Sequence, residues 1–592
     1  MERSARRETL PELVVAAARR GDRPALRYAS GERWVDVGYA QLADAATEIA
    51  RGLVALGVGR GDRVAILSST RPEWTLADLG ALGAGAVVAP IYHSDSPEEC
   101  LYILDHSDSR VVFCENEEQM EKVRRIRSRC PRLEHVVVFD GSAADAISLD
   151  ELRRRGRELD RELFDRIAAE IGPDDVATII YTSGTTGPPK GCVTTHGNLM
   201  RTAWMYEQRI ELGPGSLVFM FLPLAHSLAR VTQTVVLDVG ATLAYWRGDS
   251  SGLLEDLAAI RPTHVPAVPR VFEKIHSSAL VRAEEQGRLR RGIFGRALAT
   301  GRRMRELERR GHRAPPLLRF RHALADRLVL SKVRGLFGPE LQLALTGAAP
   351  IERGVLEFLD ACGVLVLEGY GLTESTAAAT LNTPTGLRFG TAGLPLPGCE
   401  VAIAADGEVL LRGPNVFDGY FKDDAATMEV LGEEGWLQTG DLGSLDDAGF
   451  LRITGRKKDV IITSGGKNVA PGNIEAALRE IRWVSEAVVF GDRRPYLVAL
   501  LTLDPAEAPS LARRLGVGAD VASMAVHERV RDELSREVEG VNRRFARAEQ
   551  IKRFAILDRD LTQQAGELTP TLKVRRQAVQ AEFRDVVESL YR

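Results

Sequence analysis

Short runs of consecutive apolar residues, rich in valine and isoleucine, recur through the first 400 residues and alternate with segments of helical periodicity. Such runs are typical of strands that are buried on both faces, and their alternation with helices predicts a largely parallel α/β architecture. No internal repeat with a period of about 20–50 residues is visible. The predicted strands cover residues 63–69, 86–92, 110–115, 135–140, 176–183, 217–224, 241–246, 341–347 and 364–371.

The pattern changes after residue 400, where the runs 407–413 and 449–455 are bounded by glycines and predict a small β-rich subdomain. The remaining part of the chain predicts a separate α+β unit. We therefore expect an N-terminal domain over residues 1–454 and a C-terminal domain over residues 455–592. In the latter, an apolar stripe at helical spacing predicts a packing face rather than a cofactor site, and consists of Val530, Leu534, Val538, Val541 and Phe545.

Length and composition agree with a folded protein of several domains. The chain has 592 residues, which exceeds what one hydrophobic core of about 250–300 residues can organise. Hydrophobic residues make up 44% and charged residues 27%, a balance that excludes disordered and fibrous proteins. The net charge is only −4, so no overall positive charge recruits nucleic acid, and we expect no nucleic-acid partner.

The cysteines and the hydropathy bear on the compartment. Six cysteines without a CxxC pair exclude a disulfide scaffold and a recognisable zinc site, and indicate a reducing cytosol. No apolar stretch reaches the roughly 18–20 residues that a membrane-spanning helix needs. The N-terminal segment has charged residues within its apolar patch and no small-residue cleavage site, so we expect no signal peptide. A cytoplasmic location is predicted.

The strongest chemical signal is the segment YTSGTTGPPKG at residues 181–191, where a predicted strand runs into a loop. Glycines let backbone N–H groups approach an anion, hydroxyls donate further hydrogen bonds, and lysine adds positive charge, as a polyphosphate requires. It is not a Walker A loop, because Pro188 and Pro189 precede the lysine and glycine follows it; the alternative is an ordinary hairpin turn. The candidate phosphate-binding residues are Thr182, Ser183, Gly184, Thr185, Thr186, Gly187 and Lys190.

This segment resembles the signature loop of the adenylate-forming, or AMP-binding, superfamily, which includes acyl- and aryl-CoA synthetases, luciferases and peptide-synthetase adenylation domains. In that family the loop wraps the β- and γ-phosphates of ATP. Further motifs follow in the family's order, so the resemblance extends from about residue 25 to residue 585. It implies a large N-terminal adenylation domain, with α/β subdomains and a small β-rich subdomain, and a small mobile α+β C-terminal domain.

Two motifs follow predicted strands. The first, TGAAP at residues 346–350, has small residues that leave room for a flat ring, although an ordinary strand-to-helix turn has the same composition. The resemblance assigns Gly347, Ala348 and Ala349 to the wall of an adenine site.

The second motif, EGYGLTE at residues 368–374, includes Gly369 and Gly371 among the expected nucleotide-binding residues. Tyr370 is suited to stack on a purine, and Thr373 to donate to the α-phosphate. Glu374 offers a hard oxygen ligand for Mg²⁺, although a lone carboxylate in a loop is more often simply solvated.

Two later motifs complete the ribose site and the hinge. WLQTGD at residues 436–441 places Asp441 after a Thr-Gly turn, and a carboxylate is suited to accept hydrogen bonds from both ribose hydroxyls. GRKKDVIITSGGKNVAP at residues 455–471 matches the family's hinge region. The resemblance implies that Arg456 reaches the ribose and that the C-terminal domain turns about Lys458. It also implies that the thiol passage is bordered by Ser464, Gly465 and Gly466.

The segment GELTPTLKVRR at residues 566–576 carries Lys573, which matches the family's catalytic lysine. Family members commonly have glycine before this lysine, and here the residue is Leu572, which puts the local geometry of the loop in doubt. A Thr-Pro-Thr-x-Lys pattern is nevertheless typical of the long-chain branch. A lone lysine at such a position is otherwise a surface charge.

The segments FLPLAHSLARV at 221–231 and PAVPRVFEKI at 266–275 also resemble the long-chain branch. His226 is expected at the junction of the acyl and thiol passages, the alternative being a structural histidine. The resemblance implies an ATP-dependent long-chain fatty acid–CoA ligase that uses ATP, Mg²⁺ and CoA and needs no obligate protein partner.

Three alternatives stay open. The first is a fatty acyl-AMP ligase that passes its acyl group to a carrier protein, and the second is a ligase for medium-chain or aryl acids. The third is a catalytically silent regulator that binds an acyl group or a nucleotide. The regulator is disfavoured because Lys190, Glu374, Asp441 and Lys573 are all present.

Residues 288–334 hold fifteen Arg and Lys residues against three acids, interleaved with Leu, Phe and Ile. Such a basic amphipathic region is typical of peripheral contact with an anionic membrane, here the inner membrane surface. The alternative is a solvated helical face in an arginine-rich chain.

Overall fold

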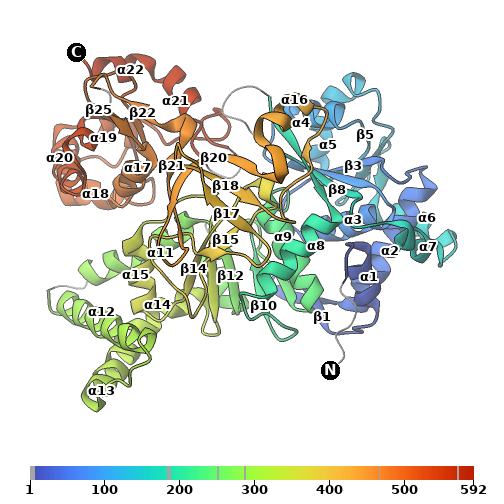
Figure 1. Ribbon diagram of the computed structural model, residues 1–592, viewed down its shortest axis with the longest axis horizontal. Coiled ribbons are helices and arrows are strands. Elements are labelled where there is room, and N and C mark those ends of the chain that lie inside the picture. Colours follow the sequence, from blue (N-terminus) through green and yellow to red (C-terminus); the bar gives the residue numbers. More distant parts are fainter. Residues whose placement is uncertain (1–6, 183–187, 250–251, 286–287, 466, 570–572) are drawn as a thin grey trace.

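The computed structural model describes residues 7–182, 188–249, 252–285, 288–465, 467–569 and 573–592. It confirms the predicted α/β class, with two large sheets, a smaller antiparallel sheet and a C-terminal α+β unit (Figure 1). The predicted strands are present within a few residues of their expected bounds.

An eight-stranded sheet carries the phosphate-loop segment, in the order β19-β9-β8-β4-β3-β5-β6-β7. The strands from β8 to β7 pair in parallel, whereas β9 pairs antiparallel with β8 and β19. Continuous Val/Ile runs form these central strands because helices cover both of their faces. The strands are β3 (Arg63–Ser68), β4 (Val87–Tyr92), β5 (Ser109–Cys114), β6 (His135–Val138), β7 (Ile147–Ser148), β8 (Val176–Thr182), β9 (Lys190–Thr195) and β19 (Gly419–Tyr420).

A nine-stranded sheet has the order β16-β15-β14-β13-β12-β10-β11-β1-β2. The predicted strand 217–224 was too long, because β10 ends at Met220 and Pro223 lies in the loop that follows. There the Thr70 hydroxyl accepts a hydrogen bond from the backbone N–H of Leu224 at 3.0 Å. The strands are β1 (Pro24–Ser30), β2 (Arg33–Gly38), β10 (Leu217–Met220), β11 (Thr242–Tyr245), β12 (His264–Ala267), β13 (Leu343–Thr346), β14 (Val366–Tyr370), β15 (Thr380–Leu381) and β16 (Leu394–Pro395).

The β-rich region after residue 400 forms a four-stranded antiparallel sheet, and the C-terminal unit follows it. The core of that unit gathers residues from Ile461 onward, including Val530, Leu534, Val538 and Val541 of the predicted packing stripe. The domain boundary near residue 455 stays a prediction. The strands are β17 (Glu400–Ile403), β18 (Glu408–Arg412), β20 (Leu437–Leu445) and β21 (Leu451–Arg456), then β22 (Ile461–Ile462), β23 (Asn468–Val469), β24 (Val484–Phe490), β25 (Leu497–Leu503) and β26 (Ile551–Ile556).

Helices cover the two large sheets and the C-terminal sheet. They are α1 (Pro11–Ala18), α2 (Tyr39–Ala55), α3 (Pro72–Gly83), α4 (Pro97–His106), α5 (Glu117–Ile126), α6 (Leu149–Glu158), α7 (Leu163–Glu170), α8 (His196–Glu207), α9 (Ser227–Val239), α10 (Leu253–Ile260), α11 (Pro269–Glu285), α12 (Arg288–Arg309), α13 (Pro316–Ala325), α14 (Ser331–Arg334), α15 (Arg353–Ala361), α16 (Asp424–Val430), α17 (Pro471–Arg479), α18 (Ala508–Leu515), α19 (Val521–Ala525), α20 (Glu528–Asn542), α21 (Arg576–Glu582) and α22 (Arg584–Ser589). Within the described ranges, no helix is long and apolar enough to cross a membrane.

A buried ion pair fixes α9 between the two large sheets. Arg230 of α9 pairs with Asp78 of α3 at 2.8 Å, and both side chains are almost completely buried. Gln233 donates a hydrogen bond to Asp78 Oδ2 at 2.9 Å, and Arg230 donates to the hydroxyl of Thr178 on β8 at 3.3 Å. Burying two charges is costly unless they are paired and hydrogen-bonded, so this network fixes where α9 lies relative to β8.

Candidate active site

The TGAAP and EGYGLTE segments leave two neighbouring parallel strands, β13 and β14, at the same edge of the sheet. At Gly347 an added Cβ atom would lie 3.2 Å from the carbonyl oxygen of Gly369, and at Gly371 only 2.5 Å from that of Ala377. Glycine is therefore required at position 371, where the backbones approach closely. Ala348 has a φ of 67°, a left-handed conformation that costs free energy in a residue with a side chain.

A hydrogen-bonded network joins three of the predicted nucleotide-binding residues. The Tyr370 hydroxyl donates to Asp441 Oδ2 at 2.7 Å, and Arg456 Nε donates to Asp441 Oδ1 at 3.1 Å. Asp441 lies on β20 opposite Arg456 on β21, so the strand register itself sets this pair. Burial raises the pKa of Asp441, and the Arg456 guanidinium partly offsets that rise. Both carboxylate oxygens are therefore oriented before any ligand binds.

The phosphate-loop segment forms a β8–β9 hairpin whose base is described and whose tip is not. Ser183, Gly184, Thr185, Thr186 and Gly187 lie outside the described residues. At the base, the Thr182 hydroxyl donates to the carbonyl oxygen of Lys190 at 3.4 Å. The ammonium of Lys190 lies 4.9 Å from the centre of the Tyr420 ring, a cation–π distance.

Tyr420 connects the hairpin to the expected metal ligand. Its hydroxyl donates to Glu374 Oε1 at 2.8 Å, and its strand, β19, pairs with β9 beside the hairpin base. Glu374 and Thr373 lie in a short 3₁₀ turn after β14. Lys190, Tyr420 and Glu374 thus form one contiguous row.

Lys573 reaches this site from the C-terminal unit. Two hydrogen bonds close its loop. The Thr569 backbone N–H donates to the carbonyl oxygen of Lys573 at 2.8 Å, and the Lys573 backbone N–H donates to the Thr569 hydroxyl at 3.0 Å. Burial and the neighbouring Arg456 guanidinium lower the pKa of Lys573, Asp441 and Glu374 oppose the shift, and the resulting pKa is about 8. The ammonium therefore lies within electrostatic range of all three residues. Leu572, the departure from the family pattern, lies outside the described residues.

His226 caps the N-terminus of α9. Its Nδ1 atom accepts a hydrogen bond from the backbone N–H of Leu228 at 3.2 Å, which places the ring proton on Nε2. Burial lowers the pKa of His226 to about 3, and Lys573 contributes to that shift, so the ring is neutral and lies close to the lysine. His226 therefore has a structural role as a helix cap, and its expected role at the junction of the two passages stays a prediction.

The hinge and thiol-passage residues are not brought into this cluster. Lys458 is exposed in a 3₁₀ turn between β21 and β22. Ser464 and Gly465 are exposed between β22 and β23, and Ser464 donates from its backbone N–H to the carbonyl oxygen of Arg494. Gly466 lies outside the described residues.

Sequence reasoning missed two residues of the site. Tyr420 carries no motif of its own apart from the Gly-Tyr dipeptide that forms β19. Glu368 begins the EGYGLTE segment, and its Oε2 atom is buried without a hydrogen-bond partner among the described residues. Burial raises the pKa of Glu368 to about 8, partly offset by Arg452. A buried, unpaired carboxyl at the end of β14 is a polar group available to a ligand.

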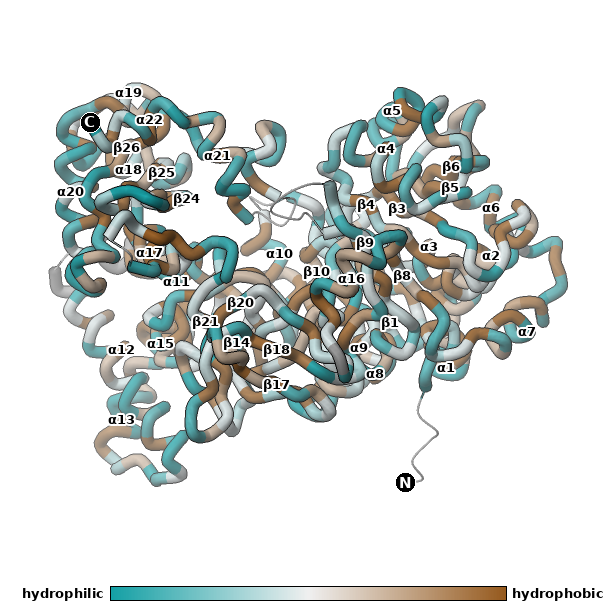
Figure 2. Tube along the Cα trace, turned by 45° about the horizontal axis from the view of Figure 1, so that its top comes forward, coloured by the Kyte–Doolittle hydropathy of each residue, from teal (hydrophilic) through white to brown (hydrophobic). Residues whose placement is uncertain are grey.

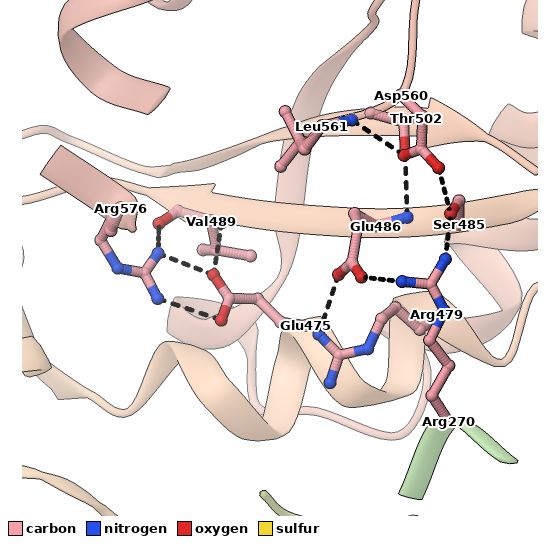
Figure 3. Close-up of polar contacts among 10 residues, drawn as sticks. All are labelled: Arg270, Glu475, Arg479, Ser485, Glu486, Val489, Thr502, Asp560, Leu561 and Arg576. Atoms are coloured by element: carbon pink, nitrogen blue, oxygen red, sulfur yellow. Dashed lines mark hydrogen bonds and ion pairs between the residues drawn. The ribbon is translucent and has the colours of Figure 1, made fainter. Parts of the chain in front are cut away.

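Arginine side chains join the C-terminal unit to the rest of the chain. Arg270, at the start of α11, donates to Glu486 Oε1 at 3.0 Å and to the Ser485 hydroxyl at 2.9 Å. Figure 3 shows Arg270 reaching from its helix into the C-terminal sheet, where Asp560 accepts from Ser485 at 2.8 Å. This contact fixes one corner of the unit.

A second contact involves two carboxylates and one guanidinium. Arg544 donates to Glu480 at 2.6 Å and to Glu352, which precedes α15, at 3.2 Å. Burial raises the pKa of Glu480 to about 7, Arg544 opposes the shift, and the neighbouring charge of Glu352 adds to it. A third ion pair joins Arg575 to Glu99 at 3.5 Å.

A narrow apolar cavity lies between α8, α9 and the nine-stranded sheet. Its walls include Tyr206 of α8, Leu228, Val231 and Val235 of α9, and Leu345 of β13. Leu228, the α9 residue of the cavity wall nearest the N-terminus of the helix, follows the capping residue His226 by two positions.

Comparisons with known families agree with these motifs. The family model described as "AMP-binding enzyme" matches residues 13–421, and the model described as "AMP-binding enzyme C-terminal domain" matches residues 458–592. Together they span most of the chain.

Relatives with curated names point the same way. The chain is 40% identical to the long-chain-fatty-acid–CoA ligase FadD15 of Mycobacterium bovis, over 94% of this chain and 92% of the relative. It is 33% identical to the long-chain-fatty-acid–CoA ligase ACSBG1 of Rattus norvegicus, over 96% of this chain and 84% of the relative. A solved fatty acyl CoA synthetase of Mycobacterium tuberculosis superposes with a TM-score of 0.62 and 25% identity, covering 98% of this chain and 99% of the other.

Proposed function

Because this chain belongs to the AMP-binding enzyme family, we propose that it is an ATP-dependent long-chain fatty acid–CoA ligase. The reaction has two steps. The fatty acid carboxylate attacks the α-phosphorus of ATP, and the bond from that phosphorus to the oxygen bridging the β-phosphate breaks. Pyrophosphate departs, and an acyl-adenylate is formed. The CoA thiol then attacks the acyl carbonyl, AMP leaves, and the thiol proton passes to solvent.

Charge repulsion is the main barrier to the first step, since two anions must meet. We assign Lys573 to the space between the carboxylate and the α-phosphate, where a fixed cation stabilises the transition state. Lys190 and the loop residues 182–187 would hold the outgoing phosphates. Tyr370, Asp441 and Arg456 would hold the ribose, with the Tyr370–Asp441–Arg456 network already formed.

The donor set also fits Mg²⁺. Mg²⁺ is usually held by one or two carboxylates together with substrate phosphates rather than by a protein cage, and no cluster of three ligating side chains occurs in the described part of the chain. Glu374, beside Lys190 and oriented by Tyr420, would hold it, and the bound ion would neutralise phosphate charge.

The adenine and the acyl chain would bind on opposite sides of the β13–β14 strand ends. Gly347, Ala348, Ala349, Gly369 and Gly371 would form the wall of the adenine site, and the buried Oε2 atom of Glu368 would offer a polar atom at its edge. The apolar cavity along α9 would receive part of the acyl chain, and neutral His226 at the N-terminus of α9 would lie at the junction of the acyl and thiol passages.

The second step needs a thiol near the position that Lys573 occupies. We propose that the C-terminal unit beyond Lys458 turns about this residue, which removes Lys573 and brings Ser464, Gly465 and Gly466 to the thiol passage. The observed arrangement, with Lys573 inside and Ser464 exposed, fits the first step. We call it the Lys573-in pose.

One observation carries the proposal: Lys573 of the C-terminal unit lies within electrostatic range of Asp441, Arg456 and Glu374, all of which precede the proposed hinge at Lys458. A nucleotide-binding regulator has no need of that lysine. A panel of fatty acids from acetate to about twenty carbons tests the assignment, with AMP and ADP measured with and without CoA. We expect AMP release and acyl-CoA with long chains.

Each alternative has its own signature in that panel. AMP formation without acyl-CoA would indicate an acyl-AMP ligase that needs a carrier protein. A maximum at short or aromatic acids would indicate the corresponding ligase. ADP, or no turnover with any acid, would overturn adenylation itself.

The compartment is also our proposal. All six cysteines are free thiols and all are buried, which fits a reducing cytoplasm. We expect no nucleic-acid partner and no obligate protein partner, and we place peripheral contact with the inner membrane surface in residues 288–334.

A further inference from the structure

Helices α12 and α13 form a hairpin that projects away from both large sheets, and α13 lies at its outer end (Figures 1 and 2). No residue of α13 is buried. Leu318, His322 and Ala325 are half-buried, which marks the side of the helix nearest the rest of the chain. The opposite side therefore faces outward.

That outward side carries Leu317, Phe320 and Leu324, and the apolar stripe continues through Leu328 in the π-helical segment Asp326–Leu330 that directly follows α13. These side chains are 62%, 70%, 52% and 47% exposed, respectively. Their spacing of three, four and four residues places them on one helix face. Scattered exposed apolar residues are ordinary, but a contiguous row of four at the tip of a projection marks an interaction surface.

Arginines border the stripe on both sides. Arg321 follows Leu317 by four residues, and Arg327 follows Leu324 by three, so each lies next to the stripe on the helix surface. Both are exposed and neither pairs with an acid among the described residues, as is also true of Arg313 and Arg319.

The acids of the hairpin cannot repel an anionic partner, because each is already paired. Glu306 binds Arg303 and Arg310, Glu308 binds Arg305, and Asp326 binds Arg334. Fifteen basic residues against three acids give residues 288–334 a charge of +12, in a chain whose total is −4. The positive charge of the molecule is thus concentrated where the apolar stripe is exposed.

We propose that α13 lies in the surface of a bilayer that contains anionic lipids, with its apolar stripe in the acyl region and Arg321 and Arg327 at the headgroups. An interfacial helix needs this combination of an apolar face and flanking cations with aliphatic stems long enough to reach the headgroups. A second copy of the chain is a poorer occupant, because two such hairpins would bring +12 against +12.

This inference narrows the membrane contact proposed above from 47 residues to one helix face and does not depend on the ligase reaction. It has a functional consequence, since long-chain fatty acids partition into bilayers. The hairpin would keep the enzyme at the surface where its substrate dissolves.

Vesicle co-sedimentation tests the proposal without ATP or CoA. We expect the intact protein to bind phosphatidylcholine vesicles containing about 30% phosphatidylglycerol, weakly at high salt and weakly to phosphatidylcholine alone. The double variant Phe320→Ser with Leu324→Ser should lower the partition coefficient at least about tenfold. Arg321→Gln with Arg327→Gln should lower it by about tenfold on anionic vesicles only.

Matched controls separate this effect from general surface changes. Met428→Ser and Val526→Ser remove apolar side chains that are 73% and 86% exposed elsewhere, and binding should not change. Because all six native thiols are buried, a Phe320→Cys variant can be labelled with an environment-sensitive fluorophore. We expect a blue shift on anionic vesicles, and none for a label on Val526→Cys.

Three results would overturn the proposal. The first is no binding of the intact protein to anionic vesicles, and the second is binding that the stripe variants leave unchanged. The third is concentration-dependent self-association in solution that the stripe variants abolish while vesicle binding persists, which would assign the stripe to a second copy. None of these results bears on AMP release, so the ligase assignment stands or falls separately.

Discussion

Asp441 and Lys573 belong to the same site but are held in different ways. Asp441 is fixed by strand pairing, by Tyr370 and by Arg456, all within the N-terminal region and the sheet that ends it. Lys573 comes from a loop closed by two hydrogen bonds with Thr569, in a unit that contacts the rest of the chain through arginines such as Arg270 and Arg544. The Asp441 side of the site is therefore fixed within the N-terminal sheets, whereas Lys573 is supplied by the C-terminal unit.

The difference shows how one site can serve two reactions. A nucleotide that must stay bound through both steps needs groups that do not move, and strand register provides them. A cation needed only for the first step is better placed on a unit whose contacts are polar and few, because such contacts exchange readily with water. Breaking each side separately should therefore affect different half-reactions.

The largest effect should come from removing the delivered cation. Lys573→Ala should lower the adenylation rate by about 10²–10³-fold, since it removes one preorganised charge at the reacting phosphate. Conversion of supplied acyl-adenylate to acyl-CoA should change little. Pyrophosphate exchange and single-turnover thioester formation measure the two steps, with Lys552→Ala as a control; equal losses in both would contradict the assignment.

Restricting the hinge should have the reverse effect. Lys458→Pro should retain adenylate formation and slow the thioester step by at least about tenfold, because proline limits the backbone rotation that exchanges the two faces. Lys458→Ala removes the charge but keeps the rotation, and should behave like the unmodified protein. An unchanged rate of acyl-CoA formation in the proline variant would contradict the assignment of Lys458 as the hinge.

The pH dependence should follow the delivered cation as well. Burial lowers the pKa of Lys573 to about 8, so the ammonium is present below pH 8 and is lost as the pH rises. We expect kcat/KM for adenylation to fall by about tenfold per pH unit above 8. Lys573→Arg keeps its charge over this range and should lack the decline, whatever its absolute rate.

The smallest effect should come from loosening the contact in Figure 3. Arg270→Ala removes two hydrogen bonds to Ser485 and Glu486, which should destabilise the Lys573-in pose and slow adenylation by about three- to tenfold. Thioester formation from supplied acyl-adenylate should be unchanged or faster. Arg270→Lys should recover part of the loss, and Lys274→Ala, one turn later on α11, should have no effect.

The strands and the permanent half of the site could be predicted because their signals are local. A Val/Ile run such as residues 110–115 fixes a buried strand by itself, and the EGYGLTE segment carries its chemistry at one strand end. The fold class was confirmed on that basis, but the predicted strand at β10 was too long because Pro223 follows it, and β1, β2, β9 and β12 were not predicted.

Other features are encoded by tertiary contacts that no short segment reveals. Tyr420 acts through Lys190 and Glu374, which lie far from it in sequence, and Glu368 is notable only because its oxygen is buried and unpaired. The basic region 288–334 was visible as composition. Its apolar stripe became distinct once α13 was seen to have no buried residue.

The carboxylates that Arg544 joins at the domain contact imply that the motion itself exchanges protons with the solvent. Beside Glu352, Glu480 has a pKa raised to about 7, whereas an exposed glutamate titrates near 4.3. Burial is the largest cause of this rise, and Glu352 adds to it from across the domain contact, so forming the Lys573-in pose favours the protonated form of Glu480. Acidification toward pH 5 thus favours that pose, and this bias disappears as the pH rises through 7. In weakly buffered solution, a pH-indicator dye should therefore register proton uptake when the Lys573-in pose forms and proton release when it opens.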